Sequence, residues 1–307
     1  PIWSIDVAIL PHVARSVKAE CILNCKDILG EVPVWDPEGD RIWWLDVSRA
    51  SLQSLEMSTG RHEVRQLPGK TVGGWAPRKG GGAVVALDSG LHRYGFERVG
   101  ALIAEIPPPE TQATHRVNEA AVDCLGRLWI GTMERSGESP TGGIHLLDPA
   151  GTIRNVRGGL LIPNGICFDP SYTTVYFADS RRRTIWAQEL DPIEGGLGAQ
   201  RRFHDFYGIP GMPDGAAIDV EGCLWIACFG GWRVVRIDPT GRVDLSVELP
   251  VEKVTSVAFG GSDMRTLFIT TASGKLTEHQ LAEQPLAGAL FAVHSPVSGF
   301  IQPPFAG

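Results

Sequence analysis

The sequence predicts an all-β fold, a six-bladed β-propeller with four antiparallel strands in each blade, on three observations. The chain has 37 Gly and 22 Pro among 307 residues, which favours many tight turns over long helices. A hairpin pattern recurs: apolar residues, an Asp, a Gly-containing turn, then an apolar run rich in Trp and β-branched residues. Its copies follow one another every 41–50 residues, a period typical of propeller blades.

Six copies of the hairpin pattern fill the chain in order. Four are clear, namely PVWDPEGDRIWWLD, AAVDCLGRLWIGT, ICFDPSYTTVYFAD and AAIDVEGCLWIAC, and two are weaker, namely GWAPRKGGGAVVALD and VAFGGSDMRTLFITT. In chain order their anchor positions are Asp36, about Arg78, Asp123, Asp169, Asp219 and about Gly260. Each copy predicts the two inner strands of one blade.

A second hairpin follows the first in each unit and predicts the two outer strands. Its turns include Ser58-Thr59-Gly60, Pro149-Ala150-Gly151 and Pro239-Thr240-Gly241. Where it is present, Pro presets φ at the first turn position, and Gly supplies the later positive φ. The six units span about residues 26–300. The stretch AECILNC before them is one strand left over, which we expect to complete the last blade and close the ring. We therefore expect residues 1–307 to form one propeller domain.

Composition limits the partners that the protein can bind and the cellular compartment in which we expect it. A net charge of −7 disfavours binding to nucleic acid or to an anionic membrane. No apolar run approaches the roughly 20 residues that span a bilayer, and PIWSIDVAILPH lacks the basic start of a signal peptide. Most of the six cysteines lie in apolar runs, where a reduced Cys behaves as a small hydrophobic residue. We expect free thiols and a cytoplasmic protein.

The repeat register locates a candidate metal site. In a propeller, the residue just before each innermost strand lies at one mouth of the central channel. Five positions before the clear anchors stand Glu31, Asn118, Asn164 and Asp214, whereas the weaker copies place Gly73 and Thr255 there. Asn and Asp before a strand are often only turn residues. However, a turn does not need the carboxylate of Glu31, so two carboxylates and two amides at one axis predict a hard divalent cation site.

The motifs around these positions resemble those of a known family. In order and spacing, LGEVPVWD, RVNEAAVDCLGRLWIGTM, IPNGICFD and MPDGAAIDVEGCLWIA are similar to motifs of the gluconolactonase/regucalcin (senescence marker protein) family. The C-terminal FGGSDMRTLFITTA and QPLAGALFAV resemble its bacterial sugar-lactonase members. The resemblance implies a six-bladed propeller with one catalytic divalent metal held by Glu31, Asn164 and Asp214. It also implies that Arg116 and Asn118 contact the substrate.

Two positions depart from the family pattern. Glu119 stands where the family usually has Asp, and we assign it to the substrate-binding set with Arg116 and Asn118. The family's further substrate-binding acid, counted on from the GTM motif, falls at Ser136, with Glu134 and Glu138 close by. These departures concern the choice of sugar.

The predicted function is divalent-metal-dependent hydrolysis of a sugar (aldono) lactone to its aldonic acid. By the resemblance, Asp214 is the catalytic base, although a cation that lowers the pKa of its own water is an equal alternative. Arg116 and Asn118 would orient the lactone oxygens and stabilise the oxyanion. Ca²⁺ is the favoured cation, with Mg²⁺, Mn²⁺ and Zn²⁺ as alternatives. The competing functions are a phosphotriester hydrolase on the same scaffold and a non-enzymatic calcium-binding protein. We expect a monomer.

Overall fold

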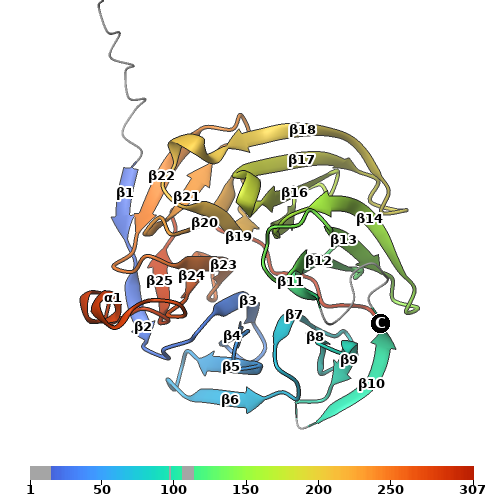
Figure 1. Cartoon of the computed structure of the whole chain (residues 1–307), viewed down its shortest axis with the longest axis horizontal. Coiled ribbons are helices and arrows are strands. Elements are labelled where there is room, and N and C mark those ends of the chain that lie inside the picture. The colour runs from blue at the N-terminus through green and yellow to red at the C-terminus, as the bar shows by residue number, and fades with distance from the viewer. Residues whose placement is uncertain (1–14, 97, 106–113) are drawn as a thin grey trace, which may run out of the picture.

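The predicted propeller is confirmed. The computed structural model describes residues 15–96, 98–105 and 114–307, whose strands form six β-sheets arranged as blades around a common axis (Figure 1). Within each blade the strands follow one another in chain order from the axis outward, except that β1 and β2 are the outermost strands of the fifth and sixth blades. The innermost strands of neighbouring blades contact one another, so the six of them together enclose the axis.

The first three blades run from residue 30 to residue 160. The first blade comprises β3 (Gly30–Asp36), β4 (Arg41–Asp46), β5 (Ser51–Glu56) and β6 (His62–Gln66). The second comprises β7 (Val72–Pro77), β8 (Ala83–Leu87), β9 (Gly90–Tyr94) and β10 (Val99–Ala104). The third comprises β11 (His115–Val122), β12 (Leu128–Glu134), β13 (Gly142–Leu147) and β14 (Ile153–Leu160).

The last three blades complete the ring. The fourth comprises β15 (Pro163–Phe168), β16 (Thr174–Asp179), β17 (Thr184–Leu190) and β18 (Leu197–Asp205). The fifth contains β19 (Met212–Ile218), β20 (Leu224–Phe229), β21 (Arg233–Ile237) and β22 (Val243–Glu248). The sixth contains β23 (Val254–Gly260), β24 (Thr266–Thr271) and β25 (Leu290–His294).

Two strands from the start of the described chain attach to the fifth and sixth blades. β2 (Glu20–Leu23) pairs antiparallel with β25 as the outermost strand of the sixth blade, as predicted for AECILNC, and so closes the ring. β1 (Arg15–Lys18) pairs parallel with β22, so the fifth blade has five strands rather than the predicted four. This extra strand covers the outer edge of β22 and satisfies its backbone groups there.

Helical structure is sparse and lies in the loops. The helix α1 (Glu278–Glu283) lies between β24 and β25, and Thr277 and Gln280 form a capping box at its start. Short 3₁₀ turns span Ser180–Arg182 and Phe206–Gly208. Within the residues described, no helix is long and apolar enough to cross a membrane. The stretch PIWSIDVAILPH lies outside the described residues.

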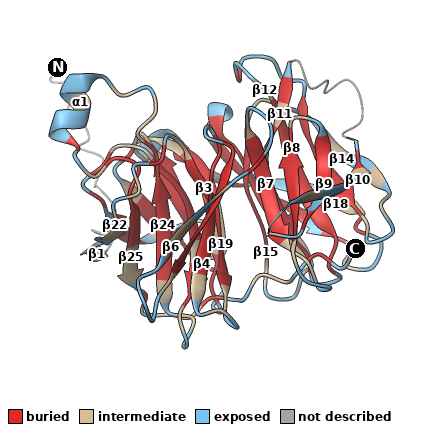
Figure 2. Ribbon diagram, turned by 90° about the horizontal axis from the view of Figure 1, so that it is seen from below, coloured by how far each residue is buried: buried red, intermediate tan, exposed pale blue. Residues whose placement is uncertain are grey.

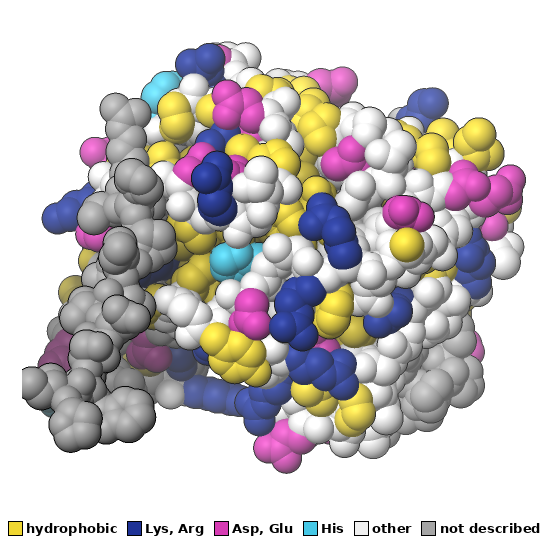
Figure 3. Space-filling view, turned by 90° about the horizontal axis from the view of Figure 1, so that it is seen from above, with side chains coloured by type: hydrophobic (Ala, Val, Ile, Leu, Met, Phe, Trp, Pro, Cys, Tyr) yellow, Lys and Arg dark blue, Asp and Glu magenta, His cyan; other side chains and the backbone are white. Residues whose placement is uncertain are grey.

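Apolar side chains pack between adjacent blades to form the core. Figure 2 shows buried residues concentrated on the strands and exposed residues on the loops at the two ends. In one such layer, Trp225 of the fifth blade meets Phe259 of the sixth edge to face at 5.8 Å. Figure 3 shows one outer side of the molecule, where acidic and basic side chains are interspersed among uncharged ones.

The C-terminal segment crosses one end of the central channel. Leaving the sixth blade, it passes the fifth, where Val220 N–H donates to Ser298 O at 3.0 Å. It reaches the second blade, where Phe305 N–H donates to Pro77 O at 2.8 Å and the Phe305 ring is fully buried. Figure 1 shows this segment, in red, passing behind the inner strands. Between it and the opposite mouth lies a cavity of about 120 Å³, lined by residues including Val34, Ile166, Ala217, Val257 and Phe300.

Candidate metal and substrate site

Every inner strand departs from regular pairing near its first residues. A register shift against the second strand occurs in all six blades, between Glu31 and Val34, Val72 and Gly74, Val117 and Glu119, Asn164 and Cys167, Pro213 and Ala216, and Val254 and Ser256. Such irregularities re-aim side chains near functional sites. They lie at the mouth opposite the C-terminal segment, where the register argument predicts the site.

The local backbone is unusual directly after two of the predicted ligands. Val32, which follows Glu31, has φ +48°, a left-handed conformation that is a genuine outlier for a β-branched residue. Gly165, which follows Asn164, has φ +58° and adopts the same region without strain. Because the first and fourth blades lie on opposite sides of the ring, the same turn occurs twice across the axis.

The two weaker repeats contribute no ligand, for different physical reasons. At Gly73 a Cβ atom would lie 1.9 Å from the carbonyl oxygen of Val117, so no side chain fits. Thr255 is fully buried, and its hydroxyl donates to Gly30 O at 2.5 Å. The bond joins the sixth blade to the start of the first, directly before Glu31, so it supports the site without belonging to it.

The two predicted carboxylate ligands are buried close enough to repel each other. Glu31 and Asp214 are 7% and 6% exposed. Burial first, and then the negative charges of Asp214 and Glu119, raise the pKa of Glu31 well above its ordinary value. Burial and the charge of Glu119 likewise raise the pKa of Asp214, while Arg116 opposes this shift. A cation between these groups would relieve both the burial cost and the repulsion.

The two asparagines form one hydrogen-bonded unit. Asn118 Nδ2 donates to Asn164 Oδ1 at 2.6 Å and to Pro163 O at 3.1 Å. Asn164 Nδ2 in turn donates to Ser180 Oγ at 2.9 Å. Since its amide nitrogen donates to Ser180, Asn164 presents its oxygen toward Asn118. The repeat register had indicated both asparagines but not Ser180, which lies in the loop after β16.

Glu119 is more buried than its neighbour Asn118. Its carboxylate accepts hydrogen bonds from Gly165 N–H at 2.9 Å and from Ala120 N–H at 3.1 Å, and it borders the 120 Å³ cavity. Burial raises its pKa to about 7, although these two hydrogen bonds lower it. Its contacts therefore link the third blade to the turn that follows Asn164.

Arg116 stands two residues before Asn118 on β11 and is half-buried. Burial lowers its pKa, while the charges of Glu31 and Asp214 raise it, so the guanidinium is an electrostatic partner of both acids. It borders a cavity of about 30 Å³ together with residues that include Thr71, His115 and Thr132. This cavity offers space for a small polar group beside the guanidinium.

The residues near position 136 occupy a surface loop. Ser136 donates to the Glu134 carboxylate through both its hydroxyl and its N–H, which lowers the pKa of Glu134. Glu138 is exposed and forms an ion pair with Arg181 at 3.5 Å. The ion pair joins loops of the third and fourth blades at the mouth that holds the site.

The donor set fits a hard cation. Among the described residues, no group of three or more His, Cys, Asp or Glu side chains is arranged to hold a metal. A cation here therefore needs the asparagine oxygen together with the carboxylates of Glu31 and Asp214. An all-oxygen set of this kind suits Ca²⁺, Mg²⁺ or Mn²⁺ better than Zn²⁺. Two observations support this fit: the buried acids Glu31 and Asp214 repel each other, and the amide nitrogen of Asn164 already donates to Ser180.

Comparison with known proteins identifies relatives along the whole chain. Residues 29–273 match the model of the family described as SMP-30/Gluconolactonase/LRE-like region. The chain is 35% identical over 291 residues to the 6-deoxy-6-sulfogluconolactonase of Pseudomonas putida, covering 94% of this chain and 98% of that protein. It is 33% identical over 294 residues to a pentonolactonase of Haloferax volcanii, covering 94% and 96%.

A solved structure also resembles the whole chain. The calcium-binding protein regucalcin from Agrobacterium tumefaciens superposes with a TM-score of 0.89 at 29% identity, covering 96% of this chain and all of that one. The chain therefore belongs to the SMP-30/gluconolactonase/LRE-like family, which confirms the resemblance carried by its motifs.

Proposed function

We propose that the protein is a divalent-metal-dependent hydrolase that opens a sugar lactone to its aldonic acid. The observation that supports the proposal is the mutual electrostatic influence of Glu31, Asp214 and Arg116 at one mouth. Glu119, whose charge also acts on both acids, is bonded to Gly165 N–H directly after Asn164. The names of the lactonase relatives support the reaction class. Three free buried thiols and the absence of a disulfide among the six cysteines, all of which are described, fit the proposed cytoplasmic location.

Glu31, Asn164 and Asp214 would hold the cation, which, when bound, acts as a Lewis acid toward the ester carbonyl. The chain's own groups then divide the remaining work. Asp214 accepts the proton of the attacking water as the general base, because its carboxylate is the acceptor that lies beside the proposed cation. Arg116 and Asn118 orient the lactone and stabilise the charge that develops on its oxygen.

Glu119 has a supporting role within this proposal. Its carboxylate accepts from two backbone N–H groups, one of them at Gly165, so it supports the turn that carries Asn164 besides its proposed place in the substrate-binding set. The proposed partner is a small-molecule sugar lactone, and Ca²⁺ is the proposed cation. The proposed state is a monomer, since the ring of six blades closes on itself.

The test is a pH-stat panel of aldono-lactones and phosphotriesters, run with added Ca²⁺, Mg²⁺ or Mn²⁺ and again with a chelator. We expect lactone hydrolysis that the chelator abolishes and that the cation restores. Hydrolysis of phosphotriesters alone would replace the proposal with the competing hydrolase. Tight Ca²⁺ binding without turnover of any ester would replace it with a binding protein.

A further inference from the structure

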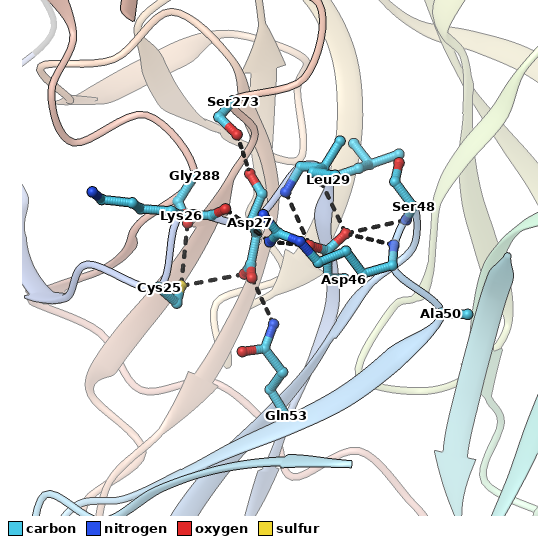
Figure 4. Close-up of polar contacts among 12 residues, drawn as sticks. Cys25, Lys26, Asp27, Leu29, Asp46, Ser48, Ala50, Gln53, Ser273 and Gly288 are labelled. Carbon is cyan, nitrogen blue, oxygen red and sulfur yellow. Dashed lines mark hydrogen bonds and ion pairs between the residues drawn. The ribbon is translucent and has the colours of Figure 1, made fainter. Parts of the chain in front are cut away.

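The loop that leads into Glu31 is held by a buried aspartate. Asp46, the last residue of β4, is fully buried and accepts hydrogen bonds from Ile28 N–H at 3.0 Å and Leu29 N–H at 3.3 Å (Figure 4). These residues stand three and two positions before Glu31. Val47 N–H also donates to Leu29 O at 2.9 Å. The N–H groups of Ile28 and Leu29 and the carbonyl oxygen of Leu29 are therefore all hydrogen-bonded.

An arginine completes this arrangement. Arg49, three residues after Asp46, donates through Nη1 to Asp46 at 2.8 Å and to the carbonyl oxygen of Lys26 at 2.9 Å. Lys26 stands five positions before Glu31. We call Asp46 and Arg49, with the backbone groups they bind, the first clamp.

The fourth blade repeats the arrangement before Asn164. Asp179, the last residue of β16, is fully buried and accepts from Leu161 N–H at 3.1 Å and Ile162 N–H at 3.3 Å, three and two positions before Asn164. Arg182 donates to Asp179 at 2.7 Å and to the carbonyl five positions before Asn164 at 2.8 Å. We call Asp179 and Arg182, with the backbone groups they bind, the second clamp.

The second blade shows a variant of the arrangement. Asp88 accepts from the N–H groups of Lys70 and Thr71, three and two positions before Gly73. Its arginine partner, Arg135, comes from the next blade rather than from three residues onward. Among the described residues, an aspartate that ends the second strand and binds the arginine three residues later occurs in the first and fourth blades. Both of these blades supply a predicted ligand.

We propose that the two clamps are positioning devices that set the affinity of the site for its divalent cation. The inference rests on the proposed function and names residues that act through Glu31 and Asn164 without touching the cation. Glu31 and Asn164 come from opposite blades, so the spacing of their oxygens depends on both loops. Each ligand also precedes a left-handed residue, a conformation that persists only where the surrounding structure fixes it.

The test compares Asp46→Asn and Asp179→Asn with Asp219→Asn in the full chain. Asp219 is a matched control because it is also fully buried and paired with an arginine, Arg236 at 2.8 Å, but lies at the other end of β19. Ca²⁺ is titrated calorimetrically into chelator-treated protein. We expect the dissociation constant to rise at least tenfold in both clamp variants and to stay within twofold in Asp219→Asn, whose melting temperature falls at least as far.

Amide hydrogen exchange of the metal-free protein gives a readout independent of the cation. Exchange should accelerate at residues 28–34 in Asp46→Asn and at residues 161–166 in Asp179→Asn, with both segments unchanged in Asp219→Asn. If either clamp variant does not fold, Arg49→Gln or Arg182→Gln replaces it under the same criteria.

The outcomes separate the two proposals. Unchanged Ca²⁺ affinity in both clamp variants, with tight binding by the unaltered protein, overturns the positioning role and leaves the proposed function intact. An equal loss in Asp219→Asn shows a general stability effect and also overturns it. Failure of the unaltered protein to bind Ca²⁺, Mg²⁺ or Mn²⁺ overturns the proposed function, and the positioning role with it.

Discussion

Asp219 and Glu31 are buried carboxylates at opposite ends of the central channel, and their surroundings differ. At the end crossed by the C-terminal segment, both oxygens of Asp219 are saturated with donors. Oδ1 accepts from the N–H groups of Glu221 and Cys223 at 3.0 Å, and Oδ2 accepts from Trp225 Nε1 at 2.9 Å and Arg236 Nε at 2.8 Å.

The third blade repeats that pattern with Asp123. Its Oδ1 accepts from the N–H groups of Leu125 and Arg127, and its Oδ2 accepts from Trp129 Nε1 and from the Arg127 guanidinium. At the other mouth, by contrast, the Glu31 carboxylate accepts one long bond, from Val32 N–H at 3.3 Å, among the described residues. A saturated carboxylate stabilises the fold, whereas an unsaturated one is available to a ligand.

The largest expected effect is on turnover. Asp214→Asn should lower kcat/KM for the lactone by about 10²–10⁴-fold, because the proposed base and one negative charge of the cation site are lost together. The metal-free variant should be at least as stable as the parent, since a buried repulsion is removed. Steady-state kinetics and urea unfolding measure the two quantities. Turnover near the parent value would contradict the role of Asp214.

The next effect is on stability and concerns the opposite end. Asp219→Ala should reduce the free energy of unfolding by about 3–5 kcal/mol, because the buried Arg236 loses a buried partner. Urea unfolding of the metal-free protein measures the change. The folded fraction should keep its Ca²⁺ affinity, since Asp219 lies at the far end of β19. A loss below about 1 kcal/mol would show that the saturated acids do not stabilise this end.

The pH dependence of the metal-free protein should distinguish the two ends as well. Burial raises the pKa of Glu119 from 4.5 to about 7, so the folded protein holds a proton that the unfolded chain releases. The stability from this group is fully present below about pH 4.5 and is lost as the pH rises to about 7, a change on the order of 3 kcal/mol.

Urea unfolding at several pH values, compared between the parent and Glu119→Gln, isolates this contribution. The variant should lose less stability than the parent between pH 4.5 and pH 7. Saturating Ca²⁺ should stabilise the parent more at pH 8 than at pH 5, because protons compete with the cation for the same carboxylates. Parallel curves for parent and variant would contradict the raised pKa.

The smallest effect belongs to an anchor that is only partly buried. The Asp36 side chain is 37% exposed, and its bond from Trp43 Nε1 is 3.5 Å long. Asp36→Asn should therefore change the free energy of unfolding by about 1 kcal/mol or less, far below the effect at Asp219. Thermal unfolding of the two variants side by side tests the ranking. Equal losses would show that burial does not set the contribution of these anchors.

Repeat spacing alone predicted the architecture and most of the candidate site. Equivalent positions of a propeller converge on one axis, so a register of five residues before each anchor predicts that Glu31, Asn118, Asn164 and Asp214 lie together. Arg116 and Glu119 came from the family motif. The offset between each anchor and its channel-facing residue is short and recurs in every repeat, and sequence patterns reveal such local, periodic features well.

Other features depended on contacts between segments far apart in the chain. The parallel pairing of β1 with β22, the path of the C-terminal segment and the bond from Gly165 N–H to Glu119 join residues 46 to more than 200 positions apart. The clamps have a visible signal, an Asp followed three residues later by Arg at 46–49 and 179–182. That signal gained meaning only once the ligand loops were seen to lie against it.

The sequence by itself determined the number of blades, their order and the positions that face the channel mouth, because these follow from a repeat in which each unit has the same local structure. The tertiary structure decided which carboxylates are saturated and which remain free to bind a ligand. That property depends on the donors that surround each oxygen. Other strands of the same blade supply some of them, as Arg236 does for Asp219, and the next blade supplies others, as Gly165 N–H does for Glu119.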